Sequence, residues 1–205
     1  MQRVWLFDLD DTLHHASAHI FPHINRAMTQ YVMDFLQVDE HEADRLRVHY
    51  WRRYGATLHG LMRHHGVDAE HFLWHTHQFP ELHRQLVFDR ALAHKLRQLP
   101  GKKILFSNGP RHYVDAVLKL MGIRRYFSGI FSIEDTGLHP KPSPIGYRRL
   151  LKTYRLSPAQ CTLVEDSSEN LKTAKRLGMN TVWISRKSNK PGWVDRKISS
   201  VLNLY

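Results

Sequence analysis

The chain has 205 residues, 42% of them hydrophobic and 24% charged, which is the composition of an ordinary soluble globular protein. This length allows one substantial hydrophobic core with one inserted subdomain, and no apolar run is long enough to span a bilayer. A single cysteine, Cys161, excludes an internal disulfide and fits a reducing compartment. Because no secretory signal opens the sequence, we expect a cytoplasmic protein without a membrane partner.

The chain is strongly basic, with 30 Lys and Arg against 19 Asp and Glu and a formal net charge of +11. A basic protein attracts anions, from free phosphate esters to nucleic acid. The charges are dispersed through helical patterns, in pairs such as Arg52-Arg53 and Lys102-Lys103. Net charge alone therefore does not select a partner.

The first predicted element is a strand over residues 4–7, whose four apolar residues indicate burial on both faces. Asp8 and Asp10 follow at its carboxyl end, where open α/β sheets bind their ligands. Their spacing sends both side chains to the same side of an extended chain. Two carboxylates so close repel each other, which favours either a bound cation or a shared proton.

Residues 15–87 have the three- and four-residue apolar spacing of amphipathic helices. We expect four helices, with Thr57 and Asp68 as N-caps and with Gly55 and Gly66 as C-terminal stops. The predicted architecture of this segment is an all-helical domain inserted directly after the first strand.

Histidine is the unusual feature of this segment: the chain has 16 of them, and several fall between residues 59 and 83. His71 and His75 are four residues apart and could face one way on a helix, as zinc ligands do. No cysteine or Glu-x-x-His companion supports a zinc site, so we expect a solvated, partly protonated surface.

Strands and helices alternate from residue 88 onward, which predicts βαβ units and a parallel sheet. We expect an α/β core over residues 1–14 and 88–205, with 15–87 as the inserted helical domain. The tail from residue 189 is expected to pack as one last element. The four further predicted strands cover residues 103–106, 129–132, 162–164 and 181–184.

Polar clusters follow three predicted strands: Asp8 with Asp10, Ser107-Asn108-Gly109, and Glu165-Asp166. A fourth polar residue, Lys141, lies between two prolines. The carboxyl ends of parallel strands share one edge of the sheet, so these segments can converge. Carboxylates from two strands suit Mg²⁺. A hydroxyl with backbone N–H groups suits a phosphate, and a lysine neutralises charge during phosphoryl transfer.

Each cluster alone has an ordinary structural explanation. Asn108-Gly109 is a common hairpin turn, Lys141 could be a solvated side chain, and Glu165-Asp166 could simply start a helix. The four together, in this order and each at a strand end or in a stiff loop, favour one shared site.

These four segments resemble the motifs of the haloacid dehalogenase superfamily of phosphohydrolases. They are Asp8-Leu9-Asp10-Asp11-Thr12-Leu13, Phe106-Ser107-Asn108-Gly109, Lys141-Pro142 and Val164-Glu165-Asp166-Ser167. The resemblance implies a Rossmann-like parallel-sheet core with an inserted all-helical cap of the C1 type.

The resemblance also implies a role for each matching residue. Asp8 would be the nucleophile that forms an aspartyl-phosphate, and Asp10 would protonate the leaving oxygen and later activate water. Ser107 and Lys141 would hold the transferring phosphoryl group. The cofactor would be Mg²⁺, bound by Asp8, by the backbone carbonyl of Asp10 and by Asp166. Glu165 would lie close to the ion or bind it through water.

Three stretches further resemble the pyrimidine 5′-nucleotidases: residues 54–61, 107–112 and 166–171. The implied substrate is a nucleoside monophosphate such as UMP or CMP. The residues expected to bind it are Ser107, Asn108, Gly109, Lys141 and Thr57. The sequence departs from that subgroup at Asp11, where Asn is more common, and at Ser107, where Thr is often found.

Other functions remain open at this point. The enzyme could hydrolyse another small ester, such as a sugar phosphate, phosphoglycolate or FMN, or it could be a phosphomutase. Dehalogenation needs neither a metal nor an acid–base residue, so Asp10 and Asp166 disfavour it. A non-catalytic nucleic-acid-binding module would require a clustered basic stripe, and we do not expect nucleic acid as a partner. We expect a monomer or a homodimer.

Overall fold

The computed structural model describes residues 3–205, and these residues form two compact units. One unit comprises residues 3–16 and 86–205, and the other comprises residues 17–85. Residues 1 and 2, which belong to the predicted core segment 1–14, lie outside the described part.

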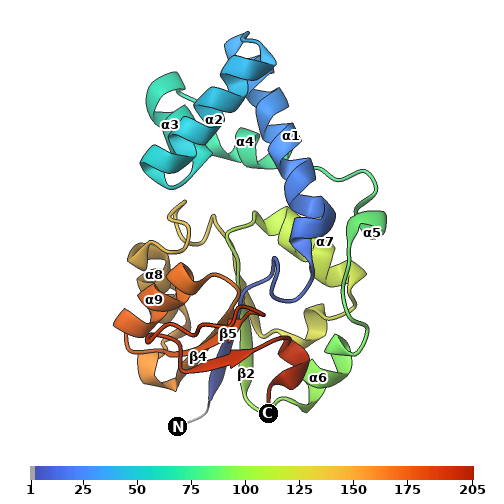
Figure 1. Cartoon of the computed structure of the whole chain (residues 1–205), viewed down its shortest axis with the longest axis vertical. Helices are drawn as coiled ribbons and strands as arrows, with labels where there is room; N and C mark the ends of the chain where they lie inside the picture. Colours follow the sequence, from blue (N-terminus) through green and yellow to red (C-terminus); the bar gives the residue numbers. More distant parts are fainter. Residues whose placement is uncertain (1–2) are drawn as a thin grey trace. The chain divides into compact units, whose positions relative to one another are not determined.

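The elements of both units follow in chain order (Figure 1). The strands are β1 (Val4–Phe7), β2 (Lys102–Phe106), β3 (Gly129–Phe131), β4 (Cys161–Glu165), β5 (Asn180–Ile184) and β6 (Arg196–Ile198). The α-helices are α1 (Ala16–Leu36), α2 (Glu40–Tyr54), α3 (Thr57–His65), α4 (Ala69–Thr76), α5 (Leu82–Gln85), α6 (Leu92–Gln98), α7 (Arg111–Leu120), α8 (Pro144–Tyr154) and α9 (Ser168–Arg176). Short 3₁₀ helices cover Arg124–Tyr126, Pro158–Gln160 and Val201–Asn203.

The first unit is built on a parallel sheet that has six strands within residues 3–205, in the order β3-β2-β1-β4-β5-β6. This is the strand order of doubly wound dinucleotide-binding folds, in which the order reverses beside β1. Val4 at the start of β1 pairs with Lys102 of β2 on one side and with Cys161 of β4 on the other. The predicted Rossmann-like α/β fold with a helical cap region is confirmed.

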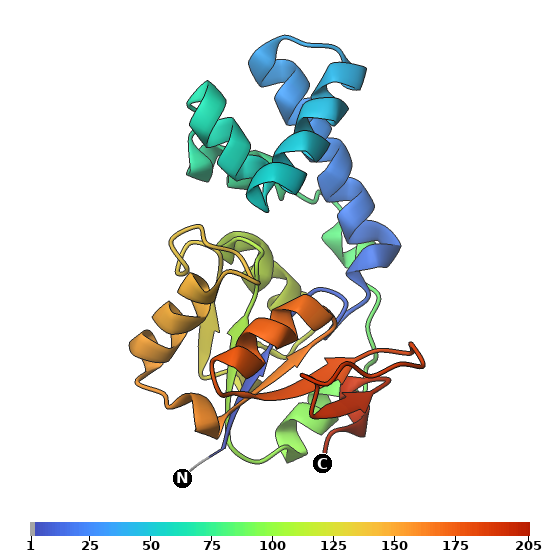
Figure 2. The same ribbon diagram turned by 60° about the vertical axis from the view of Figure 1, so that its left-hand side comes forward.

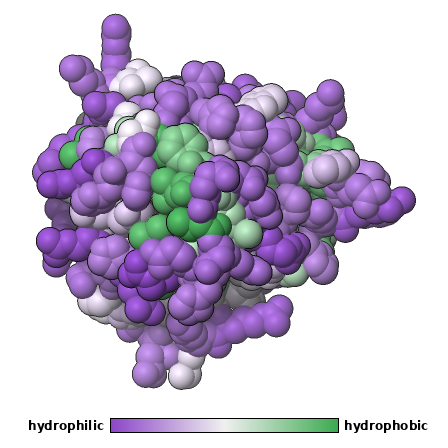
Figure 3. Space-filling view, turned by 90° about the horizontal axis from the view of Figure 1, so that it is seen from above, coloured by the Kyte–Doolittle hydropathy of each residue, from purple (hydrophilic) through white to green (hydrophobic). Residues whose placement is uncertain are grey.

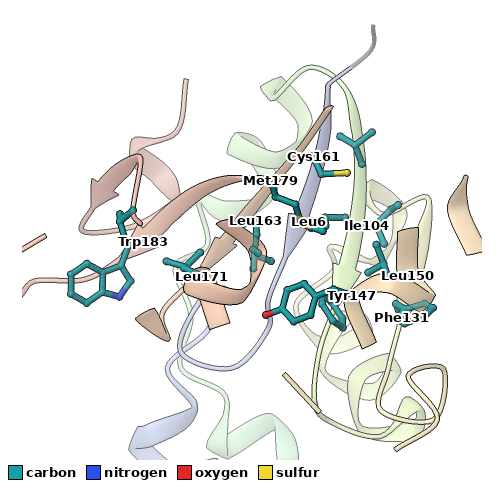
Figure 4. Packing of buried hydrophobic residues seen from close by; sticks show 14 residues of the cluster. Leu6, Ile104, Phe131, Tyr147, Leu150, Cys161, Leu163, Leu171, Met179 and Trp183 are labelled. Atoms are coloured by element: carbon teal, nitrogen blue, oxygen red, sulfur yellow. The ribbon is translucent and has the colours of Figure 1, made fainter. Parts of the chain in front are cut away.

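Helices cover both faces of the sheet, with α8 and α9 on one face and α6 and α7 on the other (Figure 1, Figure 2). Figure 4 shows the core beneath α8 and α9, where Leu6, Ile104 and Leu163 from three adjacent strands pack against Tyr147 and Leu171. All five side chains are fully buried. Burying an aliphatic side chain of this size stabilises the fold by about 1.5–3 kcal/mol, so the central strands are firmly held and their carboxyl ends have fixed positions.

The second unit consists of helices, and three of the four predicted helix-end signals are confirmed there. Gly55 and Gly66 end α2 and α3 in the left-handed conformation, and the Asp68 carboxylate caps α4 by accepting from the His71 backbone N–H. Thr57 as an N-cap is wrong: α3 begins at Thr57 itself, after an Ala56 cap without a side-chain hydrogen bond. The Thr57 hydroxyl instead donates to the backbone carbonyl of Arg47, 3.0 Å away.

The tail also differs from the prediction of a single last element. Arg196–Ile198 adds the parallel strand β6 beside β5, and Val201–Asn203 forms a 3₁₀ turn. A three-residue strand is too short to show a period in the sequence, which is why it could not be predicted.

One face of the chain is mainly polar (Figure 3). Figure 3 shows one hydrophilic face with a hydrophobic area near its centre. Among residues 3–205, no helix is both long and apolar enough to cross a membrane. In the helical unit, the large hydrophobic side chains that remain exposed are Phe21, Phe35, Trp51, Met62 and Trp74.

Candidate active site

The polar segments that follow β1, β2 and β4 lie at the shared carboxyl edge of the sheet. The Asp8 backbone N–H donates to the Val164 carbonyl at 3.0 Å, and the Ser107 N–H donates to the Phe131 carbonyl at 3.0 Å. Each hydrogen bond continues the strand ladder by one residue, so Asp8 and Ser107 sit on the rim of the sheet in fixed backbone geometry.

Lys141 occupies the centre of the site and is fully satisfied there. Its ammonium group donates to Asp8 Oδ1 at 2.7 Å, to Glu165 Oε2 at 2.7 Å and to the Phe106 carbonyl at 2.9 Å. An ammonium has three N–H donors, and these three acceptors use all of them. All three side chains, of Asp8, Lys141 and Glu165, are buried. A loop residue 133 positions after Asp8 in the sequence is thus held against the end of β1.

Asn108 fixes the backbone of Lys141 from the adjacent strand end. Its side-chain amide accepts from the Lys141 N–H at 2.8 Å and donates to the Lys141 carbonyl at 3.1 Å. The carboxamide is therefore committed to the Lys141 loop, and it positions the lysine. Contact of Asn108 and Gly109 with a substrate remains a prediction.

Burial and mutual repulsion perturb the acidic groups. The pKa of Asp8 is raised from 3.8 to about 7, mainly by burial and then by the nearby Glu165 carboxylate, although Lys141 opposes the rise. Burial likewise raises the pKa of Glu165 from 4.5 to about 7. Burial also raises the pKa of Asp166. Burial disfavours the charged Lys141, but Asp8 and Glu165 outweigh this and hold its pKa above its usual range.

The donor set fits a divalent cation. Asp8, Glu165 and Asp166 each offer a carboxylate oxygen, and these oxygens lie within 4.8 Å of one another. When ionised, the three carboxylates carry a charge of −3 and Lys141 carries +1, so the net charge of this largely buried site is −2. Because both Glu165 oxygens already accept hydrogen bonds, from Lys141 and from the Ser167 N–H, Asp8 and Asp166 are the better placed ligands.

The remaining predicted residues lie in different surroundings. Ser107 is fully buried, and its hydroxyl oxygen accepts from the Gly109 N–H at 2.9 Å. Asp10 follows Asp8 on the same segment, and its Oδ1 accepts from the Tyr113 hydroxyl at 2.5 Å and contacts His14 Nε2 at 3.0 Å. Thr57 belongs to the helical unit, so the structure does not relate it to the others.

Tyr113 and His14 are the residues that sequence reasoning missed. An aromatic residue in an amphipathic helix ordinarily indicates core packing, and nothing in the sequence distinguishes Tyr113 from its apolar neighbours in α7. His14 is one of 16 histidines, and its position four residues after Asp10 is its sole signal.

The histidine pair of the helical unit does not form a recognisable metal centre. The rings of His71 and His75 lie with centroids 4.0 Å apart, and both side chains are exposed. In residues 3–205, the carboxylate trio at the sheet edge is the single group of three or more His, Cys, Asp or Glu residues arranged to hold a metal.

The chain was compared with known protein families, curated proteins and solved structures. A family model described as haloacid dehalogenase-like hydrolase matches residues 3–178. Phosphate metabolism protein 8 of Saccharomyces cerevisiae is 26% identical over 197 residues, covering 88% of this chain and 61% of that protein. Phosphoglycolate phosphatase of Vibrio cholerae is 35% identical over 74 residues, covering 36% of this chain and 32% of that protein. The chain thus spans less than two thirds of the length of these curated relatives.

Solved structures resemble the chain over nearly its whole length. CbbY from Rhodobacter sphaeroides in complex with phosphate has a TM-score of 0.70 at 19% identity, covering 99% of this chain and 96% of that one. The HAD phosphatase from Thermococcus onnurineus has a TM-score of 0.67 at 22% identity, covering 98% and 94%. At these identities, the likeness establishes the fold.

Proposed function

The chain belongs to the haloacid dehalogenase-like hydrolases, and we propose that it is a Mg²⁺-dependent phosphatase that transfers the phosphoryl group of a small ester to Asp8 and then to water. The observation that carries this proposal is the buried Lys141 ammonium between Asp8 and Glu165, with Asp166 beside them. A carboxylate nucleophile, a fixed positive charge and an acidic metal site are the parts that phosphoryl transfer needs.

In the first half-reaction, a carboxylate oxygen of Asp8 attacks phosphorus and the bond between phosphorus and the ester oxygen breaks. Asp10 donates a proton to that leaving oxygen, and Lys141 offsets negative charge beside the nucleophile. In the second half-reaction, Asp10 removes a proton from water, the water oxygen attacks phosphorus, and the bond to Asp8 breaks. Inorganic phosphate leaves and Asp8 is regenerated.

Asp8 and Asp166, with the backbone carbonyl of Asp10, would hold Mg²⁺, and Glu165 would lie beside them. When bound, the ion neutralises phosphoryl oxygens that the acidic cluster would otherwise repel. The fit rests on the donor chemistry, because hard oxygen ligands and an uncompensated charge of −2 suit a hard divalent cation.

We further propose a pyrimidine nucleoside 5′-monophosphate as the substrate. Its support is the sequence of residues 54–61, which includes the end of α2 and the start of α3 in the helical unit, together with residues 107–112 and 166–171 of the core. The helical unit would act as the cap, with Thr57 near the substrate. This assignment is independent of the chemistry at Asp8.

Phosphate release from a panel of esters tests both proposals. The panel contains UMP, CMP, dTMP, AMP, a sugar phosphate, phosphoglycolate, FMN and p-nitrophenyl phosphate, each with Mg²⁺ and with EDTA, and 2-chloropropionate serves for dehalogenation. We expect Mg²⁺-dependent release that favours the pyrimidine nucleotides. A preference for another ester would contradict the substrate assignment alone. Chloride release without phosphate release would contradict the phosphatase.

Mg²⁺ should stabilise the fold in a pH-dependent way. The raised pKa of Asp8 and Glu165, about 7 for each, means that the folded state binds their protons more tightly than the unfolded chain does. Metal-free stability should therefore fall as pH rises from about 4 through about 7, where both groups ionise. Mg²⁺ at about 100 times its Kd adds about 2.7 kcal/mol to the free energy of unfolding, which corresponds to a rise of about 5–10 °C in Tm.

Thermal unfolding at pH 5.5 and pH 8, with Mg²⁺ or EDTA, measures this effect. The rise in Tm caused by Mg²⁺ should be large at pH 8 and small at pH 5.5, and Asp166→Asn should reduce it. An equal shift at both pH values would show that the ion binds elsewhere.

A further inference from the structure

We propose that Tyr113 and His14 position the Asp10 carboxylate by binding one of its oxygens, which leaves the other oxygen to exchange the proton with substrate and water. This inference rests on the proposed phosphatase function and deepens it. It assigns Tyr113 and His14 as positioning residues that act through Asp10.

Both contacts fall on the same atom. The Tyr113 hydroxyl donates to Asp10 Oδ1 at 2.5 Å, and His14 Nε2 lies 3.0 Å from that oxygen. A carboxylate oxygen only accepts, so His14 carries its proton on Nε2. The buried Nδ1 of His14 has no hydrogen-bond partner among the described residues, and a proton there would be costly. Both donors bind Oδ1, so Oδ2 is the oxygen that remains for chemistry.

Both donors are themselves held firmly. Tyr113 is 1% exposed and the His14 side chain is fully buried. Tyr113 lies in the first turn of α7, whose start is fixed by the Arg111 N–H donating to the Glu134 carboxylate at 2.9 Å. A Cβ on Gly109 would meet the Tyr113 ring at 2.9 Å, so the glycine makes room for the ring beside the site.

His14 is placed by the turn that follows β1. The Leu13 N–H donates to the Leu9 carbonyl at 2.8 Å, which folds the chain back so that Asp10 and His14 form a local backbone bridge. Asp10 is thus held by its own turn and by a helix that lies 103 residues further along the chain. Two fixed donors restrict rotation of the carboxylate, as a general acid aligned on a leaving oxygen requires.

The leaving group provides a test of this role. An alkyl ester oxygen is strongly basic and needs a proton as it departs, whereas p-nitrophenolate leaves without one. Tyr113→Phe should therefore slow the first half-reaction about tenfold for the alkyl ester that the wild type hydrolyses fastest. For p-nitrophenyl phosphate, the first turnover should change less than about twofold. The steady-state release of p-nitrophenol should still slow about tenfold, because the second half-reaction, in which Asp10 activates water, is also slowed. A fast first turnover followed by slow later ones appears as a burst of p-nitrophenol.

Tyr147→Phe is the matched control. Tyr147 is equally buried in the same unit, but its hydroxyl donates to the Asn170 backbone carbonyl, at 2.8 Å. This variant should keep the wild-type ratio of the first-turnover rates for the two esters. His14→Gln should show the same leaving-group dependence as Tyr113→Phe. If Tyr113→Phe slowed the first turnover equally for both esters, the proposal would be overturned, since a merely structural defect affects the first half-reaction of every substrate alike.

A measurement without turnover separates this proposal from the phosphatase itself. In the metal-free protein, NMR should detect a protected His14 Nε2–H proton that shifts in Asp10→Asn and in Tyr113→Phe but not in Tyr147→Phe. If the wild type releases no phosphate while this signal behaves as expected, the proposed function fails and the positioning geometry stands. A His14 ring without that proton would overturn the positioning.

Discussion

Asp8→Asn should lower phosphate release by about 10⁴-fold or more, because an amide cannot act as the nucleophile. The variant should fold. Asparagine has nearly the same shape, and Lys141 keeps two of its three acceptors, Glu165 and the Phe106 carbonyl. Steady-state phosphate release and circular dichroism measure the two expectations.

The same variant should be at least as stable as the wild type at pH 8 without Mg²⁺. The pKa of Asp8 is raised to about 7 by burial and by Glu165, so its ionised form destabilises the fold above that pH. Asp115→Asn is the control: this exposed carboxylate lies 3.8 Å from Arg124 on the surface of the same unit. It should keep full activity. Turnover that survives in Asp8→Asn would exclude the covalent route.

Lys141→Met should slow phosphoryl transfer by about 10²–10³-fold, because it removes the fixed positive charge beside the nucleophile. It should also destabilise the metal-free protein at pH 8 by about 3–5 kcal/mol, since Asp8 and Glu165 would remain buried without their common partner. Mg²⁺ should recover part of that stability. Single-turnover kinetics and denaturant unfolding measure the two effects.

Lys103→Met offers a matched comparison. Lys103 is also buried in the core unit, but its ammonium donates to the Leu99 and Gly101 carbonyls near the start of β2. This change should cost stability without affecting the rate of phosphoryl transfer. If Lys103→Met and Lys141→Met slowed the reaction alike, the role of Lys141 would be structural only.

The fold and the meeting of the acidic segments could be predicted because they follow from topology. Apolar runs alternating with helical patterns require a parallel sheet, and a parallel sheet gathers its carboxyl ends at one edge. Asp8 and Glu165 could therefore be expected at the same edge once β1 and β4 were recognised as strands. The pairing of β1 with β4, which no sequence pattern specified, makes them neighbours. Their roles in catalysis remain predictions that the variants above test.

Other features depend on geometry that a linear pattern does not contain. The Tyr113–Asp10 hydrogen bond depends on how α7 packs against the sheet. The hydrogen bonds between the Asn108 side chain and the Lys141 backbone depend on where the loop that contains Lys141 lies. Thr57 has the residue type of an N-cap, but α3 starts one residue earlier than a Thr57 cap would place it. Local propensity marks a helix end to within a residue or two, and tertiary contacts decide the rest.

Trapping the phosphoenzyme tests the central claim most directly. The wild type is mixed with Mg²⁺ and a ³²P-labelled form of its best ester, quenched in acid within one turnover, and digested for mass spectrometry. We predict a hydroxylamine-sensitive acyl-phosphate on the peptide that contains Asp8, and no label in Asp8→Asn. Rapid phosphate release with no label on Asp8 at any quench time would contradict the account.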